Sequence, residues 1–228
     1  MNNQNNVMKL TEQQKSKLET YIAQLIEWND KINLTAITDE AGVWVKHCED
    51  SLTLLDAVNI PASGRLLDVG SGGGFPGIPL KAAREDLDVT LLDSTGKKVE
   101  FIKMAAAKSG IEVNCICARA EELARRAENR ERYDVVTARA VAALPVLAEM
   151  CLPFVKTQGE FAAMKGPGGE AEAAEAVAAI EILGGELCGI KEFELSDGSK
   201  RNIIIIKKIS QTPTKYPRTW ARISKYPL

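Results

Sequence analysis

The feature that most limits the folds open to this chain is a glycine-rich segment at residues 70–77, Gly-Ser-Gly-Gly-Gly-Phe-Pro-Gly. A strand-like run at residues 65–69 precedes it, and an apolar run with helical spacing follows it at residues 77–84. Glycine lets the backbone turn sharply and approach a ligand with no Cβ in the way. A glycine-rich turn between a strand and a helix is typical of nucleotide-binding α/β folds.

The chain after residue 64 alternates between strand-like and helix-like patterns. Strands are predicted at residues 65–69, 89–93, 113–118, 133–138, 161–165, 186–194 and 202–208. Helices are predicted at residues 77–84, 97–108, 120–128, 144–152 and 170–183. This alternation implies parallel pairing, because parallel neighbours need a crossover. No helix separates the last two strands, and the turn at Asp197-Gly198 indicates an antiparallel hairpin at one sheet edge.

The N-terminal part has a helical pattern instead. Thr11 and Gln14 form a capping-box pattern before a helical stretch with one apolar face. Asn29-Asp30 interrupts that apolar pattern, and a second helical stretch is predicted at residues 40–58. We therefore expect an α/β, Rossmann-like fold, with a mostly parallel seven-stranded sheet, an antiparallel edge hairpin and an N-terminal helical extension. The expected divisions are the helical extension at 1–60, the sheet domain at 61–210 and a basic C-terminal tail at 211–228.

Composition excludes several classes of protein. The 228 residues are 45% apolar and 26% charged, as in an ordinary globular domain. No apolar run has the length of a membrane span and no signal peptide is evident, so we expect a cytoplasmic protein, and a monomer. Five cysteines without a C-x-x-C pair, and a single histidine, argue against a disulfide framework and against a metal site.

Charge is distributed unevenly along the chain. The net charge is −2, yet the residues from 198 onward include eight Lys or Arg and no Asp or Glu. A basic end on an acidic body is typical of a contact with a polyanion. A solvated last strand and tail would give the same pattern, so charge alone leaves both interpretations open.

Three details of the glycine-rich segment favour S-adenosylmethionine over a dinucleotide or a triphosphate. Asp68 lies two residues before Gly70, where a carboxylate can bind the ammonium of a methionine moiety but would be repelled by a pyrophosphate. A G-x-G-x-x-G count from Gly70 meets Phe75, and a count from Gly72 places Pro76 beside the pyrophosphate. No Lys-Ser or Lys-Thr follows, so the P-loop pattern is absent.

Acidic residues after the second and third strands fit a bound nucleoside. Asp93 lies 23 positions after Gly70, where it can accept both ribose hydroxyls, although a helix cap near Gly96 is the structural alternative. The backbone of Ala120 and the carboxylate of Glu121 are candidates for the exocyclic amine of adenine. An ordinary acidic helix start would explain the latter pair equally well.

The fourth strand, ending at Arg139, restricts the acceptor of a methyl group. It lacks the Asn/Asp-Pro-Pro-aromatic motif typical of enzymes that act on exocyclic amines, and it lacks the cysteine nucleophile of carbon-directed enzymes. An acceptor with an available lone pair, such as guanine N7, needs no general base, and catalysis is then mostly proximity and alignment. Arg139 is a candidate for positioning the guanine or the cofactor carboxylate, or for a structural salt bridge.

With these motifs the chain resembles the bacterial small-subunit (16S) ribosomal RNA guanine-N7 methyltransferases, the RsmG or glucose-inhibited division protein B (GidB) family. The resemblance spans most of the chain and is carried by residues 28–35, 47–52, 68–80, 91–98, 119–121, 138–140, 165–166 and 215–218. The most specific motif is the run from Asp68 to Leu80. One departure follows Arg218, where Thr-Trp-Ala-Arg at 219–222 replaces a glycine- and proline-rich stretch.

The resemblance implies a methyltransferase domain at 61–210, S-adenosylmethionine as cofactor, and small-subunit ribosomal RNA or the 30S subunit as partner. The expected cofactor residues are Asp68, Gly70, Gly72, Phe75, Asp93, Ser94, Ala120, Glu121 and Arg139. The expected RNA-binding residues are His47, Lys165, Lys200, Arg201, Lys215 and Arg218. Arg139 and Lys165 are the only catalytic candidates, since a proximity mechanism requires no fixed acid or base.

Some alternatives remain open at this stage. The same loop suits an NAD-dependent dehydrogenase, or a non-enzymatic RNA-binding protein with a nucleoside fold. His47 and Asp50 are at i and i+3 on one helix face, where they either shape the acceptor pocket or fix the N-terminal part onto the sheet. Trp28, Trp44 and Trp220 are aromatic candidates for stacking on bases, although Trp28 fits the apolar face of its helix better.

Overall fold

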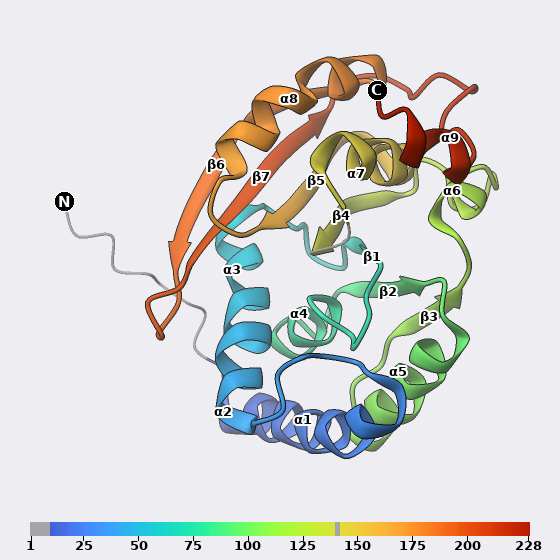
Figure 1. Ribbon diagram of the computed structural model, residues 1–228. Helices are drawn as coiled ribbons and strands as arrows, with labels where there is room; N and C mark the ends of the chain where they lie inside the picture. The colour runs from blue at the N-terminus through green and yellow to red at the C-terminus, as the bar shows by residue number, and fades with distance from the viewer. Residues whose placement is uncertain (1–9, 140–141) are drawn as a thin grey trace.

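A seven-stranded sheet runs through the centre of the computed structural model, which describes residues 10–139 and 142–228. The strand order is β3-β2-β1-β4-β5-β7-β6. The strands are β1 Arg65–Val69, β2 Asp88–Asp93, β3 Asn114–Cys117, β4 Tyr133–Arg139, β5 Val155–Lys165, β6 Gly185–Glu194 and β7 Lys200–Lys208. The first five pair in parallel, while β7 pairs antiparallel with both β5 and β6. The Rossmann-like fold with an antiparallel edge hairpin is thus confirmed (Figure 1).

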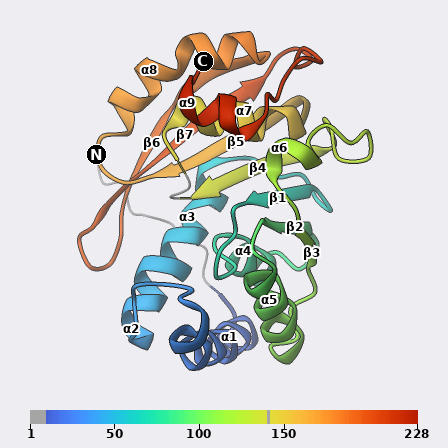
Figure 2. The ribbon, with the colours of Figure 1, turned by 45° about the vertical axis from the view of Figure 1, so that its right-hand side comes forward.

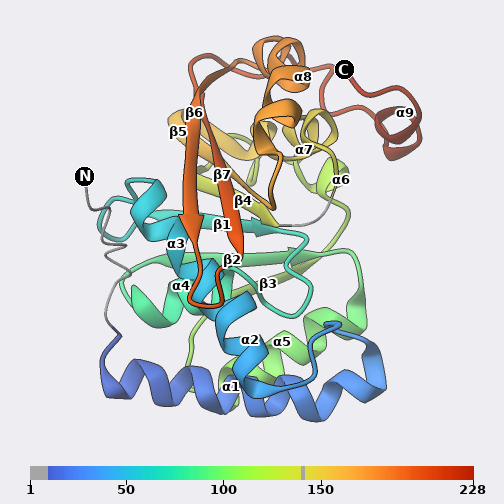
Figure 3. The same cartoon turned by 60° about the vertical axis from the view of Figure 1, so that its left-hand side comes forward.

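Helices cover both faces of the sheet. One face carries α1 Glu12–Ile32, α2 Glu40–Val43, the π-helix η1 Trp44–Glu49, α3 Asp50–Ala57, α4 Gly77–Ala83 and α5 Gly96–Lys108. The other carries α6 Ala120–Leu123, α7 Leu144–Cys151, the 3-10 helix η2 Leu152–Phe154, α8 Gly169–Ile182 and α9 Trp220–Lys225. Figure 2 shows α9 beside α7 and α6, and Figure 3 shows α1 on the opposite side of the sheet from α8.

Two hydrophobic clusters correspond to these two faces, because successive strand residues point to opposite sides of the sheet. Leu66 packs with the cluster of α1, α4 and α5, while its neighbour Leu67 packs with the cluster of α7 and α8. Both leucines are fully buried, as expected of a parallel strand covered on both faces.

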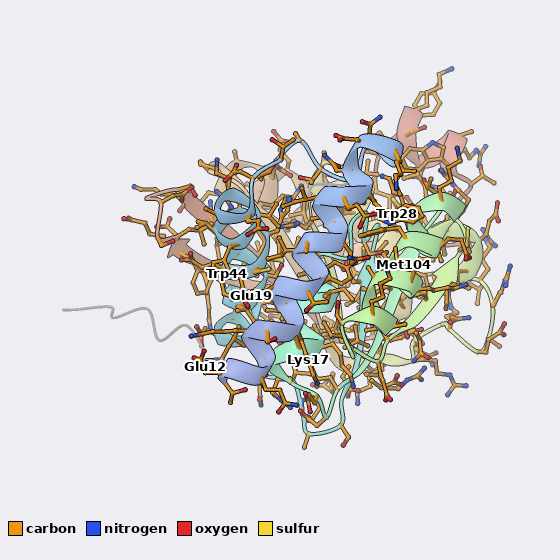
Figure 4. The ribbon with its side chains drawn as sticks, turned by 90° about the horizontal axis from the view of Figure 1, so that it is seen from below. Glu12, Lys17, Glu19, Trp28, Trp44 and Met104 are labelled. Atoms are coloured by element: carbon orange, nitrogen blue, oxygen red, sulfur yellow. The ribbon has the colours of Figure 1, made fainter. Side chains whose placement is uncertain are left out.

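The N-terminal helices share the core of the sheet. Thr11 and Gln14 form the expected capping box, and α1 buries Leu18, Tyr21 and Leu25 in the same cluster as Phe101 of α5. Figure 4 shows α1 crossing the underside of the molecule next to α5, with Trp28 and Met104 on the side where the two helices meet. This agrees with the prediction that Trp28 belongs to the apolar helix face, because its ring lies 6.2 Å from that of Phe101.

Three local predictions were wrong at their boundaries. Helix α1 does not stop at Asn29 but continues to Ile32, because the buried Asn29 side chain accepts hydrogen bonds from the amides of Leu34 and Thr35, both at 2.8 Å. Helix α6 ends at Leu123 rather than at 128, and β5 begins at Val155 rather than at 161. The predicted stretch 40–58 includes the π-turn of η1, a wider turn that frequently marks functional sites.

Candidate functional site

Two cavities lie at the carboxyl ends of β1, β2 and β4, where an open parallel sheet usually binds its ligands. The first has a volume of about 530 Å³ and the second about 300 Å³. Gly70, Lys98 and Arg139 line both cavities, so the two adjoin at these residues and are together called the groove. Its first part is bordered by the N-terminal helices and its second part by the C-terminal segment.

The glycine-rich loop forms the boundary between the two cavities. Gly70 and Gly72 have φ angles of 73° and 56°, in the left-handed region that favours glycine. The Gly70 amide donates to the carbonyl of Leu92 at 2.7 Å, and the Gly72 amide donates to Asp93 Oδ2 at 2.9 Å. A Cβ on Gly72 would meet no heavy atom nearer than 3.9 Å, so open space lies over this part of the loop.

Both carboxylate oxygens of Asp93 accept hydrogen bonds from backbone amides. Its Oδ1 accepts from the amide of Thr95 at 2.8 Å, next to the start of α5, while its Oδ2 holds the Gly72 amide. Together with Ser94 it lines the second cavity. Each carboxylate oxygen has two lone pairs, so each can accept one further hydrogen bond from a ligand hydroxyl.

Glu121 and Ala120 also line the second cavity, at the start of α6. Glu121 is buried, and its Oε1 accepts from Arg119 Nε at 3.1 Å. Its Oε2 is buried and has no hydrogen-bond partner among residues 10–139 and 142–228. A buried carboxylate oxygen without a donor is costly, so this atom is suited to a ligand N–H.

Asp68 does not line either cavity. It is fully buried beneath the loop, where its Oδ2 accepts the amide of Gly77 at 2.9 Å and its Oδ1 has no partner. Burial raises the pKa of the Asp68 carboxyl to about 7, and the Gly77 amide opposes that shift. The geometry therefore makes Asp68 a support for the loop rather than a lining residue.

The first cavity contains a stack of three side chains. The His47 ring lies 4.8 Å from the Phe75 ring, tilted by 30°, and the Arg139 guanidinium lies 5.5 Å from the same ring. Phe75 comes from the glycine-rich loop, His47 from η1 and Arg139 from the end of β4. Three segments that are distant in sequence thus meet at one wall of the cavity.

Arg139 links the N-terminal helices to the sheet. Its Nη1 donates to Asp50 Oδ2 and to the carbonyl of Lys46, both at 3.0 Å, and its Nη2 lies 3.1 Å from His47 Nδ1. Asp50 is buried, and its Oδ1 lies 3.4 Å from Arg201 Nε. The two side chains thus contact the end of β4 through Arg139 and also line the cavity, and their role towards an acceptor stays a prediction.

These contacts determine the state of His47. Burial, and next the positive charge of Arg139, lower the pKa of His47 to about 4. His47 Nδ1 lies 3.0 Å from the carbonyl of Lys46 and 3.1 Å from Arg139 Nη2, while Nε2 lies 2.7 Å from Thr35 Oγ1. At neutral pH the cavity wall carries an uncharged imidazole.

The single histidine makes this directly measurable. We predict that NMR signals of the His47 ring titrate near pH 4 and stay constant between pH 6 and 8. Because the pKa in the folded chain lies below the ordinary value of 6.5, the unfolded chain binds the extra proton first, and stability falls as pH decreases from about 6.5 to about 4. His47→Gln should remove this part of the pH dependence in urea unfolding, and an unchanged profile, or a midpoint above pH 6, would contradict the assignment.

The structure brings together only half of the expected RNA-binding residues. His47, Lys165 and Arg201 line the first cavity. Lys165 Nζ there lies 2.7 Å from Glu172 Oε2 and donates to the carbonyl of Ala142 at 2.6 Å. Lys200 borders a separate hollow at the tip of the β6–β7 hairpin.

The two expected RNA-binding residues of the C-terminal segment lie elsewhere. Lys215 is exposed and lies over the ring of Tyr216. Arg218 instead forms an ion pair at 2.6 Å with Glu149, whose side chain is fully buried in α7. The guanidinium of Arg218 therefore holds the C-terminal segment onto α7. The basic residues of this segment thus include one that attaches it to the domain, besides those that are exposed.

Sequence reasoning missed several lining residues. Lys46 and Lys98 line the groove, as do Met150 and Trp220, the latter from a segment that had no assigned role in the cofactor site. Lys98 could have been predicted as a lining residue, because it belongs to the motif that follows Asp93. Met150 belongs to α7 and Trp220 to α9, on the face of the sheet opposite α1. No local sequence pattern connects these two residues to the glycine-rich loop.

The groove thus combines a nucleoside-sized cavity, with acceptors for hydroxyl and amine groups, and a cationic cavity that continues from it. Within residues 10–139 and 142–228, no cluster of three or more His, Cys, Asp or Glu side chains could hold a metal ion. In the same ranges, no helix combines the length and the apolar character needed to cross a bilayer. The arrangement can hold a nucleoside cofactor at one end and a polyanionic acceptor at the other.

Comparisons with known proteins agree with this geometry. Residues 14–204 match the family model of rRNA small subunit methyltransferase G (GidB). Proteins named ribosomal RNA small subunit methyltransferase G are 47% identical in Desulforamulus reducens and 46% identical in Staphylococcus carnosus, and each match covers 96% of this chain and 92% of the relative.

Solved structures show the same fold at low sequence identity. TrmN from Thermus thermophilus has a TM-score of 0.53 at 19% identity, covering 70% of this chain and 48% of that chain. A crystal structure of a candidate methyltransferase from Bacillus halodurans has a TM-score of 0.54 at 14% identity, covering 71% of this chain and 99% of that chain.

Proposed function

Because the chain belongs to the rRNA small subunit methyltransferase G family, we propose that it transfers a methyl group from S-adenosylmethionine to N7 of one guanine in small-subunit (16S) ribosomal RNA. The observation that carries this proposal is the pair of adjoining cavities that share Gly70, Lys98 and Arg139. One end of the groove suits a nucleoside cofactor, and the other suits an RNA nucleotide. Family membership favours this function over a dehydrogenase or a non-enzymatic RNA-binding protein.

The residues of the second cavity fit the cofactor. The ribose hydroxyls match the free lone pairs of Asp93, and the exocyclic amine of adenine matches the unpartnered Oε2 of Glu121. The open space over Gly72 suits the part of the cofactor that passes from the second cavity to the first. Asp68 contributes by holding the Gly77 amide, and thereby the end of the loop and the start of α4.

The bound cofactor would supply an electrophilic methyl group on its sulfonium. Guanine N7 has a lone pair in the plane of the base, so the chain needs to orient the base rather than remove a proton from it. The Phe75 ring and the neutral imidazole of His47 offer a flat wall for that base. Arg139, held by Asp50, fixes this wall beside the loop, and such positioning contributes on the order of 7–11 kcal/mol in well-aligned reactions.

The charge of the first cavity fits an RNA backbone. Five basic side chains line it, against the single acid Asp50; they are Lys46, Lys98, Arg139, Lys165 and Arg201. Basic side chains that neutralise phosphates release counterions, so RNA binding should weaken steeply as salt increases.

Transfer of a labelled methyl group tests this function. Small subunits purified from cells that lack the protein should accept label from S-adenosylmethionine, and digestion should yield the label as 7-methylguanosine. Subunits from cells that contain the protein provide the matched control, since their target is already methylated and should accept none. Absence of incorporation across a range of salt and magnesium concentrations, or label in any other nucleoside, would overturn the proposal.

A further inference from the structure

The C-terminal segment forms one wall of the second cavity. Trp220, the first residue of α9, lines that cavity together with Asp93 and Glu121, and 38% of its surface is exposed. It lies outside the residues 14–204 that match the family model.

The wall is firmly anchored rather than loosely attached. Arg218 donates through Nε and Nη2 to the buried carboxylate of Glu149, at distances from 2.6 to 3.1 Å, and its amide donates to the same side chain at 2.7 Å. Arg130 donates to the carbonyls of Thr212 and Tyr216 at 2.7 and 3.0 Å.

The same anchoring continues through α9 itself. Ile223 is fully buried in the hydrophobic cluster of α7 and α8. These contacts place Trp220 at a fixed position on the rim of the cavity.

A chain of contacts leads from this rim to the acids inside the cavity. The Arg119 guanidinium lies over the Trp220 ring at 5.0 Å, and Arg119 Nε donates to Glu121 Oε1 at 3.1 Å. Arg119 thus connects the indole to the carboxylate whose other oxygen has no partner. The sulfur-containing side chain of Met150 lies in the same wall, and it offers a polarizable surface to an aromatic ligand.

We propose that Trp220 is a binding residue for the aromatic base of the cofactor, and that Arg119 and the docked C-terminal segment hold it in place. If the edge of the adenine base meets Glu121, one face of the base is turned towards the rim of the second cavity. The indole of Trp220 would supply a stacking surface for that face. This inference rests on the proposed function, because it takes the second cavity as the nucleoside site. It adds a residue to the cofactor site of this chain.

Adenosylhomocysteine is the probe for this proposal, measured by calorimetry and by tryptophan fluorescence on the full chain. Trp220→Ala should weaken binding by about 5- to 150-fold, the loss expected for removing one base–aromatic stack. Trp220→Phe should stay within about 5-fold of the natural chain, because it keeps an aromatic face. 5′-Methylthioadenosine, which lacks the amino acid part, should lose the same factor in Trp220→Ala.

Fluorescence gives a readout that separates stacking from a general loss of fold. Trp28 and Trp44 line neither cavity, so the emission change on adding adenosylhomocysteine should come from Trp220 and disappear in Trp220→Phe while calorimetry still detects binding. Tyr226→Ala is the matched control, because Tyr226 is a 62% exposed aromatic residue at the other end of α9 that lines neither cavity. Its affinity should not change.

The outcomes separate this inference from the function on which it rests. If adenosylhomocysteine does not bind the natural chain, the proposed cofactor is wrong. If it binds the natural chain and Trp220→Ala equally well, the cofactor stands and the role of Trp220 is refuted. If Tyr226→Ala loses as much affinity as Trp220→Ala, the effect belongs to the docking of α9, and the stacking role is likewise refuted.

Discussion

Replacing Gly74 by alanine is expected to abolish cofactor binding and methyl transfer, and to lower the free energy of unfolding by about 2–5 kcal/mol. Gly74 has a φ of 94°, in the region that is strained for any residue with a side chain. A Cβ there would collide with the hydroxyl of Tyr21 and lie 2.8 Å from Ile78 Cγ1. Tyr21 cannot move aside cheaply, because it is fully buried and donates to the carbonyl of Gly73 at 2.9 Å.

Gly198→Ala provides the matched control for this substitution. Gly198 has a φ of 78°, yet a Cβ there would meet nothing within 4 Å. Gly198→Ala should therefore lower the free energy of unfolding by about 1–2 kcal/mol through backbone strain alone, and should leave the binding of adenosylhomocysteine unchanged. Urea unfolding and calorimetry measure both quantities, and equal losses in the two variants would show that the contact of Tyr21 with the loop has no special role.

Arg139→Ala is expected to lower the free energy of unfolding by about 3–5 kcal/mol and the rate of methyl transfer by about 100-fold or more. The substitution leaves the buried carboxylate of Asp50 with Arg201 alone, at 3.4 Å, and it removes the donors to His47 and Lys46. The stability cost comes from the buried charge of Asp50, which then keeps only the longer ion pair with Arg201. The loss of rate comes from a displaced His47–Phe75 wall, which no longer aligns the base.

Two further variants make this prediction specific. Arg65→Ala removes an arginine of β1 whose ion pair with Asp88, at 3.4 Å, is nearly half exposed, so it should cost no more than about 1 kcal/mol and leave transfer unchanged. Arg139→Lys keeps the charge but loses the planar fork, so it should recover part of the stability and little of the rate. Full recovery of the rate by lysine would mean that charge, rather than fixed geometry, is what Arg139 contributes.

The sequence was sufficient for the parts of the fold that depend on local patterns. Strand β1 and the glycine-rich loop could be placed because a run of glycines after a strand indicates a sharp turn, and Gly70, Gly72 and Gly74 do have positive φ. The hairpin of β6 and β7 could be placed because no helix separates these strands. Asp93 and Glu121 could be assigned to the cavity because Asp93 ends the parallel strand β2 and Glu121 lies just beyond the end of β3, where such sheets bind ligands.

Local sequence patterns do not predict contacts between segments that are distant in the sequence. The partners of Arg139 come from η1 and α3, which lie 89 to 93 residues earlier, and nothing local indicates that pairing. Arg218 looks like an RNA-binding residue in a basic tail, yet its partner Glu149 is a buried acid within an apolar helix. Asp68 is likewise distinguished from a lining residue only by its burial beneath the loop.

The most direct test of the central claim is transfer to RNA that lacks the acceptor atom. Small-subunit ribosomal RNA transcribed with 7-deazaguanosine has carbon in place of N7, and it can be reconstituted into subunits beside an ordinary transcript, with sedimentation confirming that both assemble. With a labelled methyl group we predict incorporation into subunits with ordinary guanosine and none into the 7-deaza subunits. Equal incorporation into both would contradict the account, because the methyl group would then be going to another atom.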